Sequence, residues 1–190
     1  MATEVKLSTD DRRDSTVNTA ITRSKTLRMT LTGMFTAMTI ILSLSVFSIP
    51  VPGGHLYFCD TVINTAAILM DPLSAFIVGG IGSFLGDFSF YPAPMFVSLV
   101  THGLQAVVVC LISHRVLQKR QALASGIGVA VGAIIMVVGY TLGRAYVYST
   151  LEYSLIKLPF EILQAGFGAV FSMIICYPLR LRKLYGQVIG

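Results

Sequence analysis

The stretch 122-ALASGIGVAVGAIIMVVGYTLGRAYVY-148 decides the fold class of this chain, because it is apolar almost throughout and contains a single charged residue, Arg144. A helix rises about 1.5 Å per residue, so about 20 apolar residues cross a hydrocarbon core of ~30 Å. The stretch exceeds that length. We therefore predict that a helix crosses a membrane here.

The composition of the whole chain agrees with a membrane protein. Of its 190 residues, 54% are hydrophobic and 12% are charged, whereas about one quarter of the residues of a soluble protein are charged. Too few charged residues are available to cover a water-facing surface. Residues 1–24 differ, since they are polar, carry both acidic and basic residues and include no apolar run. We expect a disordered cytoplasmic tail there rather than a signal peptide.

Apolar stretches separated by breaks predict six helices, at about residues 27–48, 60–70, 73–88, 95–116, 122–148 and 155–179. Pro50, Pro52 and the following glycines exclude a helix and predict a loop, and Asp71-Pro72 predicts a turn with proline at a helix start. Asp60 is predicted to cap the second helix, which at about 16 Å is too short to cross a bilayer alone. A second topology therefore stays open, with four crossings and residues 60–88 as one re-entrant hairpin.

Basic residues form three clusters that predict the orientation. They lie before the first apolar stretch, between the fourth and fifth, and after the last: Lys6, Arg12, Arg13, Arg23, Lys25 and Arg28; Arg115, Lys119 and Arg120; Arg180, Arg182 and Lys183. Such clusters mark cytoplasmic segments. We expect an all-α protein of the cell membrane with both termini in the cytoplasm, one six-helix domain over 25–183 and a cytoplasmic end at 184–190. The net charge of +5 then needs no nucleic-acid partner.

Polar residues inside the predicted helices gather at one depth, in the outer half. Ionisable groups in a membrane are costly and usually face a cavity or a partner. Helical spacing also groups them, since residues three or four apart share a face. We predict a pocket, open to the outside, for a flat heteroaromatic ligand, with Tyr91 and Phe96 as further aromatic walls and the loop at 55–58 above it. The candidate binding residues are Glu161, Gln164, Arg144, Tyr140, His102, Gln105, Asp87, Tyr57 and His55.

Structural roles stay open for several polar residues. Arg144 and Glu161 can form an ion pair that only joins two helices, and Asp87 can pair with a neighbouring helix. Lys157 and Glu152 are interpreted as surface groups near the membrane boundary.

Small residues indicate where helices touch, because close backbone approach drives helix association in lipid. The glycines of 73–88 and 122–148 are interpreted as packing positions within the chain. Gly33 and Ala37 form a small-xxx-small pair that can either pack internally or dock another membrane protein.

Motifs for catalysis and for ATP binding are absent from the sequence. There is no G-x-x-x-x-G-K-[ST] phosphate loop and neither H-E-x-x-H nor G-x-S-x-G. The three histidines are scattered and the three cysteines lie far apart, so no metal site, cofactor or disulfide is predicted. We expect a binding protein that is not an enzyme; an intramembrane enzyme is an alternative without a motif.

Several segments resemble the substrate-binding S components of energy-coupling factor (ECF) transporters. The resemblance covers about residues 27–180 and is most specific over 49–87. Its segments are Ile49-Pro50-Val51-Pro52-Gly53-Gly54, Asp60-Thr61-Val62-Ile63, Pro72-Leu73 and Gly79-Gly80-Ile81-Gly82-Ser83-Phe84-Leu85-Gly86-Asp87. The sequence is most similar to the subgroup assigned to hydroxymethylpyrimidine or pyridoxine, whose sixth-helix motif looks like Leu158-Pro159-Phe160-Glu161-Ile162-Leu163-Gln164.

Two positions depart from that subgroup. His102-Gly103-Leu104-Gln105-Ala106 stands where Lys-Gly-x-Glu-Gly is typical, and Glu161 stands where asparagine is typical. Both departures fall in the predicted pocket, so the identity of the vitamin is open.

The resemblance implies vitamin capture from outside and association with a transmembrane coupling protein and two ATPases, whose ATP hydrolysis would reorient this subunit and release the vitamin inside. Gly33 and Ala37 correspond to the motif that contacts the coupling protein. Two alternatives remain: an S component for riboflavin, thiamine or pantothenate, and a structural or assembly protein whose polar residues only join helices.

Overall fold

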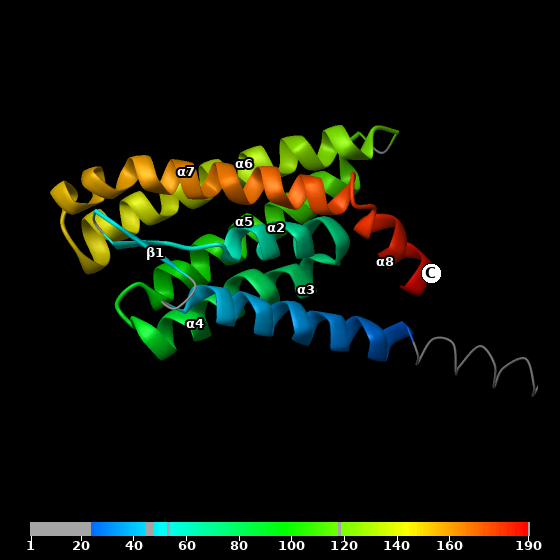
Figure 1. The fold of residues 1–190 in the computed structure, drawn as a ribbon, viewed down its shortest axis with the longest axis horizontal. Helices are drawn as coiled ribbons and strands as arrows, with labels where there is room; N and C mark the ends of the chain where they lie inside the picture. The colour runs from blue at the N-terminus through cyan, green and yellow to red at the C-terminus, as the bar shows by residue number, and fades with distance from the viewer. Residues whose placement is uncertain (1–23, 45–47, 53, 118, 190) are drawn as a thin grey trace, which may run out of the picture.

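The computed structural model describes residues 24–44, 48–52, 54–117 and 119–189. The predicted tail lies outside them except for Ser24. Nearly all of the described chain is helical (Figure 1). A first helix covers residues 24–43. The later elements are α2 (Cys59–Leu69), α3 (Pro72–Phe76), the π-helical turn η2 (Ile77–Ile81), α4 (Gly82–Phe90), α5 (Met95–Arg115), α6 (Gln121–Gly143), the π-helical turn η3 (Arg144–Tyr148), α7 (Leu151–Cys176) and α8 (Leu181–Ile189).

Each of the six predicted stretches is therefore helical over most of its described residues. Within the described residues, 4 helices are long and apolar enough to cross a membrane: Pro72–Phe90, Met95–Arg115, Gln121–Tyr148 and Leu151–Cys176. The first of these joins α3, η2 and α4, and the third joins α6 and η3. With 11 residues, α2 is short, as predicted. A membrane protein built from helices is confirmed, and the number of crossings stays a prediction.

Two local predictions were wrong. The segment predicted as a loop contains an antiparallel hairpin of β1 (Ile49–Val51) and β2 (Gly54–Leu56), with Ile49 opposite Leu56. A residue before proline favours extended backbone, so the prolines that exclude a helix are compatible with a strand. Asp60 does not cap α2, because this helix starts at Cys59 after Phe58 and has no side-chain cap.

Other local signals worked as predicted. Asp71 caps α3, where its carboxylate accepts a hydrogen bond from the Ser74 backbone N–H at 3.1 Å, and Pro72 occupies the first turn. The predicted packing glycines lie at helix contacts. A methyl group added at Gly139 of α6 would come within 2.6 Å of Thr101 on α5, and one at Gly86 of α4 would come within 2.6 Å of Ser43 on the first helix.

The central helix of the bundle is α2, whose residues are all buried except Thr61. It contacts α5 and α7, and its apolar half forms the core with Ile63, Ala66 and Ala67. Its amino-terminal half carries polar residues, which bring Asp60 and Asn64 into the interior.

The described ends of the chain lie at the same end of the bundle as the α5–α6 connection (Figure 1). The Ser24 hydroxyl donates to the Ile189 carbonyl at 3.5 Å. The α6–α7 connection and one end of the β1–β2 hairpin lie at the opposite end of the bundle. The described residues of the three basic clusters therefore lie at one end of the bundle. This is the arrangement expected if the clusters share one side of the membrane.

Candidate binding site

A cavity of about 380 Å³ opens at the hairpin end of the bundle. Its walls come from the first helix, the hairpin, α2, α4, α5, α6, η3 and α7. Of the nine candidate binding residues, all but Gln105 line it: Glu161, Gln164, Arg144, Tyr140, His102, Asp87, Tyr57 and His55. Tyr91 lines it too, whereas Phe96 is 61% exposed and packs on Phe84 of α4. The prediction for Phe96 was therefore wrong.

Arg144 and Glu161 form an ion pair in the cavity wall. A guanidinium nitrogen of Arg144 lies 2.5 Å from Glu161 Oε1, and both side chains are buried. The second carboxylate oxygen of Glu161 accepts from the Thr141 hydroxyl at 3.5 Å. The pair joins η3 to α7 and also lines the cavity, so the two roles considered for it are geometrically compatible.

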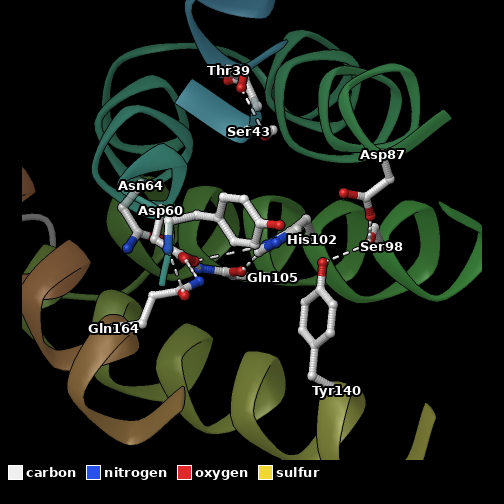
Figure 2. Close-up of polar contacts among 11 residues, drawn as sticks. Thr39, Ser43, Asp60, Asn64, Asp87, Ser98, His102, Gln105, Tyr140 and Gln164 are labelled. Carbon is white, nitrogen blue, oxygen red and sulfur yellow. Dashed lines mark hydrogen bonds and ion pairs between the residues drawn. The ribbon is translucent and has the colours of Figure 1, made fainter. Parts of the chain in front are cut away.

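Asp60 lies beneath the cavity and binds two glutamine side chains (Figure 2). Gln105 Nε2 of α5 donates to one carboxylate oxygen at 3.1 Å, and Gln164 Nε2 of α7 donates to the other at 2.8 Å. Gln105 Nε2 also donates to Asn64 at 3.2 Å. An ionised carboxylate can only accept hydrogen bonds. Asp60 therefore determines which end of each amide is the nitrogen and which is the oxygen.

The oriented amides in turn position two further groups. Gln105 Oε1 lies 2.8 Å from His102 Nδ1, and because an amide oxygen can only accept, this ring nitrogen carries a proton. Gln164 Oε1 accepts from the Tyr57 backbone N–H at 2.9 Å. One buried carboxylate thus orients a cavity histidine and attaches the segment that follows the hairpin.

A second set of polar contacts connects α4, α5 and α6 at the opposite wall. The Ser98 hydroxyl donates to the Asp87 carboxylate, and the Tyr140 hydroxyl donates to Ser98 at 2.6 Å (Figure 2). The Tyr140 ring also packs on the His102 ring, with centroids 5.2 Å apart. The expectation that Asp87 pairs with a neighbouring helix is met, and Asp87 lines the cavity as well.

Lys157 is the residue whose position differs most from its prediction. It was interpreted as a surface group, but it is 4% exposed, lines the cavity and donates to the His55 carbonyl at 2.6 Å. Hairpin and α7 approach closely enough to enclose the lysine, an arrangement that helical spacing cannot reveal. Glu152 is exposed, as predicted. Tyr57 directly follows β2, and burial of its side chain raises the pKa of the phenol well above its usual range.

Potential metal ligands in the described residues form one group, Cys59, Asp60 and His102, whose ligating atoms lie within 4.8 Å of one another. The donor set does not suit a cation. Both Asp60 oxygens accept from glutamine amides, and His102 Nδ1 faces Gln105 Oε1. Asp60 and His102 instead belong to one hydrogen-bond network through Gln105.

The predicted docking pair lies on the outer face of the first helix. Gly33 and Ala37 are both exposed, and a methyl group added at Gly33 would have no atom within 4 Å. Neither residue packs inside the bundle, which leaves the internal-packing interpretation without support.

Comparison with known proteins identifies the family. Residues 23–181 match the family model described as ECF-type riboflavin transporter, S component. The chain is also 32% identical, over 146 residues, to a protein of Pyrococcus woesei described as an uncharacterized protein in the gap 3' region. That match covers 77% of this chain and 96% of the relative. The chain therefore belongs to the ECF-type S-component family, and it is a multi-pass membrane protein that serves as a substrate-binding subunit of vitamin uptake.

Proposed function

We propose that the cavity at the hairpin end captures a flat, hydroxylated heteroaromatic vitamin from outside the cell. The observation that carries this proposal is the composition of the cavity wall. Charged groups (Arg144, Glu161), a histidine and a tyrosine ring from separate helices converge on one volume of about 380 Å³. Small-molecule sites combine largely apolar walls with a few such polar groups.

Within this class, pyridoxine and hydroxymethylpyrimidine are the first candidates. Arg144 and Glu161 would bind ring nitrogen or hydroxyl groups, and the Tyr140 ring would stack on the ligand. His102 and Gln164 would orient the ligand, and Gln105 would contribute indirectly by positioning the His102 ring. Ligand sites have volumes of about 300 Å³ and larger. The cavity, at about 380 Å³, lies near this lower limit, which favours a vitamin with a single ring.

Riboflavin is the second candidate. The description of the matching family model names it, and the cavity has aromatic side chains at its mouth, including Tyr91 and Tyr148. A larger flat ring system would contact these residues as well as Tyr140.

Transport would require partners, because the sequence contains no phosphate loop. We propose that a transmembrane coupling protein and two ATPases supply the energy. The exposed Gly33 and Ala37 would form the flat stripe on which the coupling protein docks, since small residues permit close helix contact in lipid.

The test is a titration of the purified full chain with pyridoxine, hydroxymethylpyrimidine, riboflavin, thiamine and pantothenate. We expect one of them to bind more tightly than micromolar. Glu161→Gln should weaken that binding by roughly tenfold or more, because a hydrogen bond to a charged group is lost. Glu152→Gln is the matched control: it changes an exposed glutamate of the same helix and should leave affinity unchanged. Failure of every vitamin to bind would reject the proposal.

A purely structural role for Glu161 and Gln164, in which they join helices without contacting the ligand, is the rival interpretation. The variant combining Glu161→Ala with Gln164→Leu separates the two, since a purely structural role predicts lower thermal stability and no effect on any ligand. A binding role predicts a folded protein that has lost affinity.

A further inference from the structure

The carboxyl-terminal helix α8 has an apolar face that the bundle covers only in part. Leu181, Leu184, Tyr185 and Val188 follow the spacing of one helix face. Leu181 and Tyr185 pack against the core, whereas Leu184 is 53% and Val188 60% exposed. One edge of the stripe therefore holds α8 to the bundle, and the other edge points away from it.

Cations flank this exposed edge. Arg180 and Lys183 are exposed, and no acidic residue follows Glu161 in the sequence. Arg182 has a different role, because it donates to the Tyr177 hydroxyl at 2.7 Å and lies 3.4 Å from the Ser125 hydroxyl, which ties α8 to α7 and α6. The cations available to a partner are therefore Arg180 and Lys183.

Arg180 has an unusual backbone conformation. Its φ of 60° lies in the left-handed region, which residues with a Cβ adopt at a conformational cost and which glycine adopts freely. This residue forms the turn at which the chain leaves the axis of α7 and enters α8 (Figure 1). Glycine would fit this backbone better than arginine, so Arg180→Gly removes the charge without straining the turn.

We propose that α8 lies in the membrane–water interface and binds anionic lipid. Leu184 and Val188 reach the boundary of the acyl chains, and Arg180 and Lys183 bind the phosphate headgroups. A helix with an apolar face and adjacent cations is suited to this position, and clustered basic residues next to a membrane span favour anionic lipid. α8 follows directly on α7, a helix able to span the membrane, so the bilayer surface lies within its reach. The inference does not depend on which vitamin is bound.

The depth of α8 can be measured because the chain contains no tryptophan. Val188→Trp or Leu184→Trp places a single fluorophore on the apolar edge, and Gln187→Trp places one on the exposed polar face as a matched control. The full-length variants are reconstituted in phosphatidylcholine and phosphatidylglycerol vesicles with brominated acyl chains, which quench nearby tryptophan. We expect the apolar-edge variants to be quenched about twofold more than Gln187→Trp. Equal quenching of all three would overturn the proposal.

Lipid selectivity is measured in the Val188→Trp variant with bromine on only one of the two lipids. We expect brominated phosphatidylglycerol to quench more than brominated phosphatidylcholine. Each of Arg180→Gly and Lys183→Gln should reduce that preference about fivefold. Arg180→Gly also relieves the backbone, so a lower preference in a protein of unchanged or higher thermal stability supports the charge role. Equal quenching by both lipids, or a preference that both substitutions leave unchanged, overturns it.

Discussion

Asp60 shapes the cavity although its own side chain does not line it. Its carboxylate is 1% exposed, and burying a charge is costly unless hydrogen bonds compensate. Here the two compensating donors are the amides of Gln105 and Gln164, which belong to helices on either side of α2. Each amide donates to Asp60 through its nitrogen, so its oxygen remains free to accept. The Gln105 oxygen accepts from His102, and the Gln164 oxygen accepts from the Tyr57 backbone. The orientation of several groups at the site thus follows from one charge.

Asp60→Asn should therefore disturb the site although it preserves size. The NH₂ group of the new asparagine would face the NH₂ group of Gln105 or Gln164. That glutamine would have to flip its amide, and it would then lose its hydrogen bond to His102 or to the Tyr57 backbone. We expect a loss of about 1–3 kcal/mol of stability, typical of an unsatisfied buried group, measured as a lower unfolding temperature in detergent.

Asp71→Asn is the matched control for that substitution. Asp71 is an exposed helix cap, and asparagine caps helices about as well as aspartate, so stability should change by no more than about 0.5 kcal/mol, as is usual at exposed positions. Equal stability of the two variants would contradict the role assigned to Asp60.

Residue spacing predicted the site only within single helices. Glu161 and Gln164 share a face of α7, and both reach the cavity. Contacts between elements were not predictable in this way: Asp60 was interpreted as a cap because it follows a loop, and Lys157 as a surface group because it lies near a helix end. Both are buried by neighbours distant in sequence, namely Gln105 in α5 and the hairpin.

At the scale of elements, the distance between α2 and α7 depends on one glycine. A methyl group at Gly168 would lie 2.5 Å from the Asp60 Cβ and 3.2 Å from its backbone carbonyl carbon. The neighbouring atoms belong to a buried helix, so they cannot move aside independently. Gly168 therefore allows α7 to bring Gln164 close enough to bind Asp60.

Gly168→Ala should push α7 away from α2 and lower stability by about 1–3 kcal/mol, the usual cost of overpacking. The matched control is Gly166→Ala in the same helix, since a methyl group there would meet no atom within 4 Å. Thermal unfolding of both variants is the measurement. If the two substitutions had the same effect, close approach of the helices at Gly168 would not matter.

The hairpin is attached to α7 through Lys157 as well as Gln164. Lys157→Met keeps the apolar part of the side chain but removes the bond to the His55 carbonyl. We expect the amides of β2 to exchange with solvent deuterons roughly tenfold faster, because a charge-assisted bond no longer opposes local opening. Lys183→Met, at the opposite end of the bundle, should leave exchange in β2 unchanged. Unaltered exchange after Lys157→Met would show that Gln164 alone holds the segment.

Helix positions were predictable from apolar length, while the hairpin and α8 were not. Proline and glycine between residues 49 and 54 exclude a helix but do not distinguish a loop from a short strand pair. Two strands of three residues depend on tertiary support, which here comes from α7. The helix α8 begins within the third basic cluster, and its 9 residues are too few for an apolar length signal.

For the whole molecule, the arrangement of charge favours six crossings over four. The α2–α3 turn lies close to the basic end, where Arg28 contributes to the environment of Asp71. Burial raises the pKa of Asp71, but the hydrogen bonds from Ser74 and the charge of Arg28 outweigh this effect, and the pKa lies below its ordinary value. A charged turn near a basic cluster that is predicted to be cytoplasmic agrees with a turn in water, whereas a re-entrant hairpin would place it within the bilayer.

Labelling of introduced cysteines with a membrane-impermeant maleimide tests this topology. The native Cys59, Cys110 and Cys176 are all buried, so a folded protein should give little background. Leu73 is 69% exposed beside the α2–α3 turn, and six crossings predict that Leu73→Cys is labelled only after the cells are permeabilised. Glu152→Cys, at the opposite end of the bundle, should be labelled in intact cells. A re-entrant hairpin predicts instead that Leu73→Cys stays unlabelled in both conditions, because the bilayer shields the turn; that outcome would leave four crossings as the topology and would remove the cytoplasmic position of Asp71.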